Sequence, residues 1–197
     1  MLLEKFYYML KFSPFLQNLA KRALFKLPHR EIIVCHYGQK LKVDLSELSG
    51  FYLYFEKEYD DYIFDFLNKR ISKYERVIDV GANIGIYSIY FGARAKRVDS
   101  FEPVPEIANK LVYNINLNEL KNVIVHKACV GEKSGKVSFI LPSKANQGIG
   151  RISFEDGDII ELPCISLDDF LGGVLDEPTL IKIDIEGAEL LALTGAK

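Results

Sequence analysis

The feature that most constrains this chain is a glycine-containing turn between an apolar strand and an apolar helix. Residues 77–80 (Val-Ile-Asp-Val) predict a buried strand, and residues 84–89 open a helix. Between them, Gly81 and Gly85 allow backbone conformations and close approaches that other residues resist. A second apolar strand ends at Glu102, about 20 positions after Gly81. This order is half of a nucleoside-binding βαβ fold, in which a carboxylate accepts ribose hydroxyls.

The glycine pattern departs from that of dinucleotide-binding proteins. Their fingerprint is G-x-G-x-x-G, but Asn83 stands in place of the second glycine and Ile86 in place of the third. Asp79 adds negative charge where a pyrophosphate needs positive potential. A carboxylate suits a cationic ligand, and the amino-acid end of S-adenosylmethionine is net positive. The pattern therefore predicts S-adenosyl-L-methionine as cofactor, bound by Asp79, Gly81, Asn83, Gly85 and Glu102.

The sequence Asp-x-Gly-x-Asn-x-Gly, followed by a ribose-binding Glu, resembles the cofactor site of class I S-adenosylmethionine-dependent methyltransferases. Three more segments narrow the resemblance: 101–103 (Phe-Glu-Pro), 166–171 (Ser-Leu-Asp-Asp-Phe-Leu) and 182–189 (Lys-Ile-Asp-Ile-Glu-Gly-Ala-Glu). Together with residues 79–85 they resemble the FkbM-type methyltransferase family, over roughly residues 50–197. The resemblance implies O-methylation, often of a sugar hydroxyl in a glycan, glycolipid or natural product.

The predicted fold class is α/β, with a Rossmann-like class I methyltransferase sheet. Strands at 77–80, 97–101, 122–126 and 180–184 should run parallel, and the right-handed crossover rule gives an order beginning 3-2-1-4. Class I methyltransferases continue with further strands, so the C-terminal strands are expected to be missing here. The fourth strand would then leave an apolar edge. That edge predicts either a fragment or self-association that covers it.

Three segments are predicted along the chain. Residues 1–30 hold six Lys/Arg and one acid, with apolar residues at helical spacing. They predict a basic amphipathic helical extension, which either caps the domain or lies on anionic lipid. Residues 31–70 predict a hairpin and a helix, whose aromatic side chains either cover the sheet or line an acceptor pocket. Residues 71–197 predict the cofactor-binding methyltransferase domain.

Composition excludes several classes of function. The net charge of −2 gives no general attraction to nucleic acid, and an Asn-Pro-Pro-Tyr motif typical of some nucleic-acid methyltransferases is absent. Three cysteines without C-x-x-C spacing argue against a zinc site or a disulfide framework and favour a reducing compartment. No apolar run approaches the ~20 residues that span a bilayer. The expected location is cytoplasmic, with peripheral membrane contact through residues 1–30 as an alternative.

The expected chemistry is a direct displacement at the sulfonium methyl. A sugar hydroxyl is a poor nucleophile, so a base or a metal must assist the loss of its proton. Ligands of open α/β sheets bind at the carboxyl ends of the strands, where Asp184 ends the fourth strand and Glu186 follows. Asp184 and Glu186 are therefore the predicted catalytic residues, acting on a small-molecule or glycan acceptor.

The sequence also allows alternative roles for these carboxylates and alternative functions for the chain. Glu186 and Glu189 suit capping of the next helix, and with Asp184 they form a carboxylate group that could hold magnesium (Mg²⁺), although no metal ligand is assigned. Lys182 is expected to pair with one of these carboxylates. The alternatives to a methyltransferase are an NAD(P)-dependent oxidoreductase on a Rossmann-type unit and a non-catalytic cofactor-binding remnant.

Overall fold

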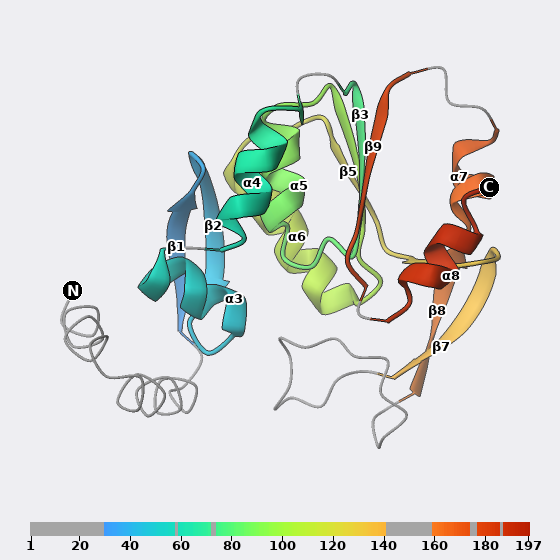
Figure 1. Cartoon of the computed structure of the whole chain (residues 1–197). Helices are drawn as coiled ribbons and strands as arrows, with labels where there is room; N and C mark the ends of the chain where they lie inside the picture. Colours follow the sequence, from blue (N-terminus) through green and yellow to red (C-terminus); the bar gives the residue numbers. More distant parts are fainter. Residues whose placement is uncertain (1–29, 58, 72–73, 141–158, 174–176, 186) are drawn as a thin grey trace. The chain divides into compact units, whose positions relative to one another are not determined.

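The computed structural model describes residues 30–57, 59–71, 74–140, 159–173, 177–185 and 187–197 (Figure 1). The chain forms two compact units, Met1–Tyr62 and Ile63–Lys197. The extension predicted at 1–30 lies outside the described residues except for Arg30, so its helical character and its membrane contact stay predictions. Among the described residues, no helix is long and apolar enough to cross a membrane.

The first unit contains the predicted hairpin. Strands β1 (Glu31–His36) and β2 (Gln39–Asp44) pair antiparallel. Tyr37 and Gly38 make the turn with φ of 45° and 83°, which suits the primed turns of two-residue hairpins. The hairpin is followed by α3 (Leu48–Phe51) and a π-helix, η1 (Tyr52–Glu56).

Part of the aromatic segment forms a small core in this unit. Phe51 and Phe55 are fully buried and pack with Leu45. Their rings lie 5.0 Å apart between centroids. Phe51 and Phe55 therefore serve as core within this unit, and the predicted choice between covering the sheet and lining an acceptor pocket stays open.

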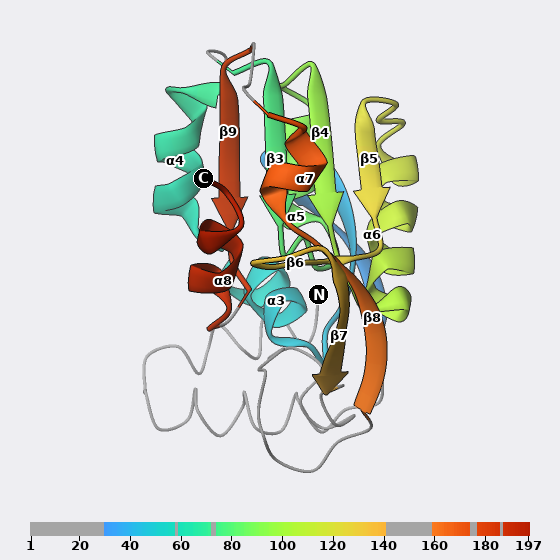
Figure 2. The same cartoon turned by 90° about the vertical axis from the view of Figure 1, so that its right-hand side faces the viewer.

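The second unit is built on a parallel sheet. Its four strands are β3 (Arg76–Val80), β4 (Arg97–Phe101), β5 (Val123–His126) and β9 (Thr179–Ile183). Their order across the sheet is β5-β4-β3-β9, which Figure 2 shows side by side. This is the predicted order 3-2-1-4, and the predicted fold class is confirmed. Among the described strands β9 pairs with β3 alone, so self-association at this edge stays a prediction.

Helices cover the two faces of this sheet differently. On one face lie α5 (Ile86–Gly92) and α6 (Pro105–Leu117), and on the other lies α7 (Leu167–Leu171), as Figures 1 and 2 agree. The remaining elements are α4 (Asp61–Asn68), α8 (Glu189–Thr194), and a small sheet of β6 (Cys129–Val130), β7 (Gly135–Ile140) and β8 (Ile159–Ile165). The boundary between the two units falls within α4.

The α7 face carries both the apolar core and a buried charge. Ile78, Val80 and Phe101 pack against Leu167 of α7. On the same face Asp99, whose side chain is fully buried, takes hydrogen bonds from Arg76 at 2.9 Å and Arg97 at 3.1 Å. His126 Nε2 lies 2.9 Å from Asp99 Oδ1, the oxygen that also accepts the bond from Arg97.

The surroundings of Asp99 fix its charge state. Burial alone would raise the pKa of Asp99, but hydrogen bonds from His126, Arg97 and Arg76 outweigh it and lower the pKa to about 2. The carboxylate thus ties together the first residues of two parallel strands and the end of a third. A buried charge held in this way is costly to leave unpaired.

Asp99→Asn is expected to lower the free energy of unfolding near pH 7 by about 2 kcal/mol or more, the value of moving a pKa from 3.8 to about 2. Because the folded-state pKa is the lower one, this stabilisation is present above 3.8 and is lost as pH falls toward 2. Urea unfolding at about pH 7 and about pH 2.5 should show the difference between variant and wild type shrinking in acid.

Glu161→Gln is the matched control for this experiment. Glu161 lies 3.4 Å from Lys136, but both side chains are largely exposed, so its loss should change stability by less than about 0.5 kcal/mol. A difference between Asp99→Asn and wild type that is the same at both pH values would contradict the electrostatic explanation.

Candidate cofactor and acceptor site

The turn between β3 and α5 adopts the conformation that its glycines predicted. Gly81, Asn83 and Gly85 all have positive φ, of 79°, 50° and 98°. Asparagine is among the few residues with a side chain that tolerate this region. The backbone N–H groups of Gly81 and Ala82 both donate to Phe101 O, at 3.0 and 2.9 Å. The turn is thereby fastened to the end of β4.

Each glycine also makes room for a neighbour. A Cβ atom on Gly81 would lie 2.0 Å from the backbone oxygen of Asp184, and one on Gly85 would lie 2.5 Å from Leu111 Cδ1. The Asp184 N–H donates to Val80 O at 3.0 Å. The chain segment that lies against Gly81 is the end of β9, which places a predicted catalytic residue directly beside the predicted cofactor turn. The close approach to a ligand that the glycines predicted stays a prediction.

Glu102 lies at the carboxyl end of β4 with its side chain largely buried. One carboxylate oxygen accepts the N–H of Asn83 and the other accepts the N–H of Val104, both at 3.0 Å. Burial raises the pKa of Glu102, and these two backbone donors oppose the rise. A carboxylate oxygen has two lone pairs, so both oxygens keep capacity for the two ribose hydroxyls that the sequence assigned to this residue.

Asp79 lies beneath the turn, not open to a ligand. Its side chain is fully buried on the α5 face. One oxygen accepts the hydroxyl of Ser88 at 2.6 Å, and the other lies 3.1 Å from Lys182 Nζ. Lys182 therefore balances the negative charge that the sequence places at Asp79. Whether Asp79 binds the cofactor stays a prediction.

Lys182 is the residue whose importance the sequence did not reveal. Its side chain is 17% exposed, and Nζ donates to Gly81 O at 3.0 Å. Nζ also lies 3.9 Å from Asp184 Oδ2 and 5.0 Å from the centroid of the Tyr87 ring. The predicted pairing of Lys182 with a carboxylate of its own segment is thus a longer contact than the unforeseen one with Asp79.

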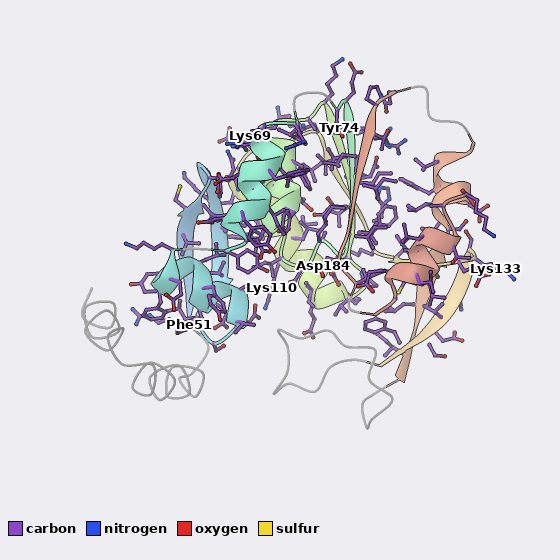
Figure 3. The ribbon with its side chains drawn as sticks, viewed as in Figure 1. Phe51, Lys69, Tyr74, Lys110, Lys133 and Asp184 are labelled. Atoms are coloured by element: carbon purple, nitrogen blue, oxygen red, sulfur yellow. The ribbon has the colours of Figure 1, made fainter. Side chains whose placement is uncertain are left out.

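Asp184 directly follows β9. Figure 3 shows it at the carboxyl end of the strands, opposite to the end where Tyr74 lies. Its side chain is 66% exposed. A fixed backbone and an exposed carboxylate together suit a group that must meet a second substrate.

The other two carboxylates of this segment differ. Glu189 accepts the N–H of Gly187 with both oxygens, at 3.1 and 2.9 Å. Hydrogen bonds from its own N–H and from that of Gly187 lower the pKa of Glu189. It therefore caps the start of α8, which was one of the predicted alternatives. Glu186 lies outside the described residues, and its catalytic role stays a prediction.

Magnesium finds no support in this arrangement. Among the described residues there is no group of three or more His, Cys, Asp or Glu side chains placed to hold a metal ion. Of the three carboxylates proposed for it, Glu189 is taken up by backbone donors.

The order of the strands, the glycine turn and the position of Glu102 together define a class of protein. A parallel sheet in the order 3-2-1-4, with a positive-φ turn after its first strand and Glu102 after its second, is the cofactor-binding half of a class I S-adenosylmethionine-dependent methyltransferase. Residues 79–197 match the methyltransferase FkbM domain. The chain belongs to the FkbM methyltransferase family, as the motifs predicted, and this membership argues against the NAD(P)-dependent alternative.

Two relatives have assigned names. The chain is 32% identical over 118 residues to the hexuronic acid methyltransferase AglP of Haloferax volcanii, covering 59% of this chain and 48% of AglP. It is 26% identical over 143 residues to methyltransferase 1 of Beauveria bassiana, covering 60% of this chain and 57% of the relative. The chain thus spans about half the length of these curated relatives.

Among solved structures, M. jannaschii TYW2 in complex with AdoMet is similar over 50% of this chain and 43% of TYW2. The sequence identity is 28% and the TM-score is 0.38. The assignment to the methyltransferase family rests on the sheet order and the family match, not on this structural similarity.

Gly81→Ala is expected to destabilise the protein by more than its backbone conformation alone explains. Positive φ costs an alanine about 1–2 kcal/mol, and displacing the Asp184 backbone should add roughly 1–3 kcal/mol. Gly172→Ala separates the two effects, because Gly172 has φ of 70° but nothing within 4 Å of its would-be Cβ. Urea unfolding should show Gly81→Ala as the more damaging variant, and equal losses would contradict the packing explanation.

Glu102→Gln is expected to weaken binding of S-adenosylhomocysteine by about 1–3 kcal/mol, the cost of losing a charged hydrogen-bond partner. Calorimetry measures the affinity, and the thermal midpoint reports any loss of folding. Glu106→Gln is the control, since Glu106 is an exposed acid nearby in α6. Unchanged affinity in a folded Glu102→Gln protein would remove Glu102 from the cofactor site.

Proposed function

We propose that this chain contributes to an O-methyltransferase that transfers a methyl group from S-adenosylmethionine to a sugar hydroxyl in a glycan, glycolipid or natural product. The observation that carries the proposal is Asp184. Its backbone is hydrogen-bonded to the end of β3 and touches Gly81, whereas its carboxylate is largely exposed. A base for a second substrate needs this combination of fixed position and access.

Residues along the carboxyl edge of the sheet are proposed to have different roles in the reaction. Glu102 holds the ribose hydroxyls through the free lone pairs of its carboxylate, and the turn at 81–85 fixes the nucleoside next to it. When bound, S-adenosylmethionine supplies an electrophilic methyl group on sulfur. Asp184 accepts the proton of the acceptor hydroxyl, so that the oxygen is a competent nucleophile when it reaches the methyl carbon.

The acceptor is proposed to be a hexuronic acid or a related sugar. Support comes from the similarity to AglP, whose name states that it methylates a hexuronic acid, and that shared stretch covers 59% of this chain. The acidic balance of the chain, with a net charge of −2, gives no independent reason to expect a nucleic-acid acceptor.

Direct assay of methyl transfer tests the proposal. The protein is incubated with S-adenosylmethionine and separately with p-nitrophenyl β-D-glucuronide, β-D-glucoside and β-D-galactoside, and methylated product is detected by mass spectrometry. Product with at least one sugar, and the most with the glucuronide, is the expected result. Binding of S-adenosylhomocysteine without transfer to any hydroxyl compound would favour the predicted alternative of a non-catalytic remnant.

Asp184→Asn is expected to reduce turnover by roughly 10²–10⁴, the usual range for loss of a general base. The shape is retained, so affinity for S-adenosylhomocysteine should change little. Glu132→Gln, an exposed acid between β6 and β7, is the control and should keep full turnover. If Asp184→Asn stays near wild type while Glu186→Gln loses activity, the base is Glu186. If both variants lose only thermal stability, the mechanism is wrong.

A further inference from the structure

We propose that Lys182 is a second catalytic group, which donates a hydrogen bond to the acceptor oxygen while Asp184 takes its proton. The inference rests on the proposed O-methyl transfer and adds a residue to it. Lys182 Nζ and Asp184 Oδ2 lie 3.9 Å apart. We assign the acceptor hydroxyl to a position within hydrogen-bonding distance of both atoms.

Burial and register fix the position of the lysine. Lys182 lies directly opposite Asp79 across the β3–β9 pair. Its Nζ forms an ion pair with Asp79, 3.1 Å from Oδ1, and donates a hydrogen bond to Gly81 O at 3.0 Å. An ammonium has three N–H donors, so the hydrogen bond to Gly81 leaves donor capacity for another oxygen. We therefore assign a remaining N–H of Lys182 to an oxygen that lies between Lys182 and Asp184.

The gap to Asp184 fits one oxygen atom. At 3.9 Å, Nζ and Oδ2 are too far apart for a direct hydrogen bond. An oxygen placed at ordinary hydrogen-bond lengths of about 2.9 Å from Nζ and about 2.7 Å from Oδ2 would subtend an angle of about 90° between them. A hydroxyl group can accept one hydrogen bond and donate another. It therefore matches a pair made of a donor and an acceptor.

The reaction needs both partners. As the O–H proton moves to the Asp184 carboxylate, negative charge grows on the acceptor oxygen. The oxygen then forms its bond to the methyl carbon while the carbon–sulfur bond breaks and its electron pair stays on sulfur. Lys182 keeps its own protons and stabilises the oxygen while it is negative. Preorganised donors of this kind contribute about 10²–10³ in rate.

Lys182 also has a structural role, which the test must separate from catalysis. Replacing it alone leaves the buried Asp79 carboxylate without its cation, a change that strongly destabilises proteins. Asp79→Asn removes that charge while keeping an oxygen for the Ser88 hydroxyl. The comparison is therefore between Asp79→Asn and the double variant Asp79→Asn/Lys182→Met, so that any effect of Asp79 on cofactor binding is present in both.

Turnover is measured for both proteins at saturating S-adenosylmethionine, with the hydroxyl compound that wild type methylates fastest. The double variant is expected to fold with a thermal midpoint close to that of Asp79→Asn and to turn over at least about 100-fold more slowly. Turnover within about threefold of Asp79→Asn would overturn the proposal and leave Lys182 as the partner of Asp79 only.

A second readout does not depend on activity or on the sugar assignment. A crystal structure of the wild-type protein with S-adenosylhomocysteine should show an oxygen, from water or an acceptor, within about 3.2 Å of both Nζ and Oδ2. The oxygen should be lost in the double variant. An ion pair that closes directly between Lys182 and Asp184, with no oxygen between them, overturns the proposal even if the protein proves to be a methyltransferase. Failure of the sugar assay alone leaves this result unaffected.

Discussion

The arrangement of this site depends on a backbone contact between two strands that lie far apart in the sequence. Gly81 directly follows the first strand of the parallel sheet, and the backbone oxygen of Asp184 occupies the space where a side chain on Gly81 would be. The N–H of Asp184 donates to Val80 O. Because parallel neighbours end at the same edge of a sheet, this contact joins the cofactor turn to the residue proposed to act on the acceptor.

The sheet also buries a carboxylate on each of its faces. Different partners compensate the cost of removing each of these charges from water. Asp99, on the α7 face, is surrounded by two arginines and a histidine, and its pKa is about 2. Asp79, on the α5 face, has one lysine and one serine hydroxyl. A fully surrounded charge stabilises strand ends, whereas the cation beside Asp79 retains capacity for another oxygen. The difference separates a structural ion cluster from one that can take part in chemistry.

Sequence patterns were sufficient to predict the features that depend on the local order of residues and on general rules of sheet topology. Apolar strand runs and the right-handed crossover rule gave the strand order, and the glycine spacing placed the turn. They also put Asp184 at the correct edge. The pairing of Lys182 with Asp79 was not accessible, because it depends on the register between β3 and β9, which no local pattern specifies. A lysine inside an otherwise apolar strand was the one available signal, since such a residue requires a buried partner.

The same pairing changes how the site attracts a cationic cofactor. Asp79 and Lys182 balance each other. Two further carboxylates lie at this edge of the sheet: Glu102, held by backbone N–H groups, and Asp184, 3.9 Å from the lysine. The Glu102 carboxylate accepts the N–H of Asn83, and the backbone oxygen of Asp184 lies against Gly81. We therefore expect the negative potential inferred from the sequence to come from the residues proposed for the ribose and for the acceptor. Under this proposal, cofactor binding and proton transfer draw on the same two charges.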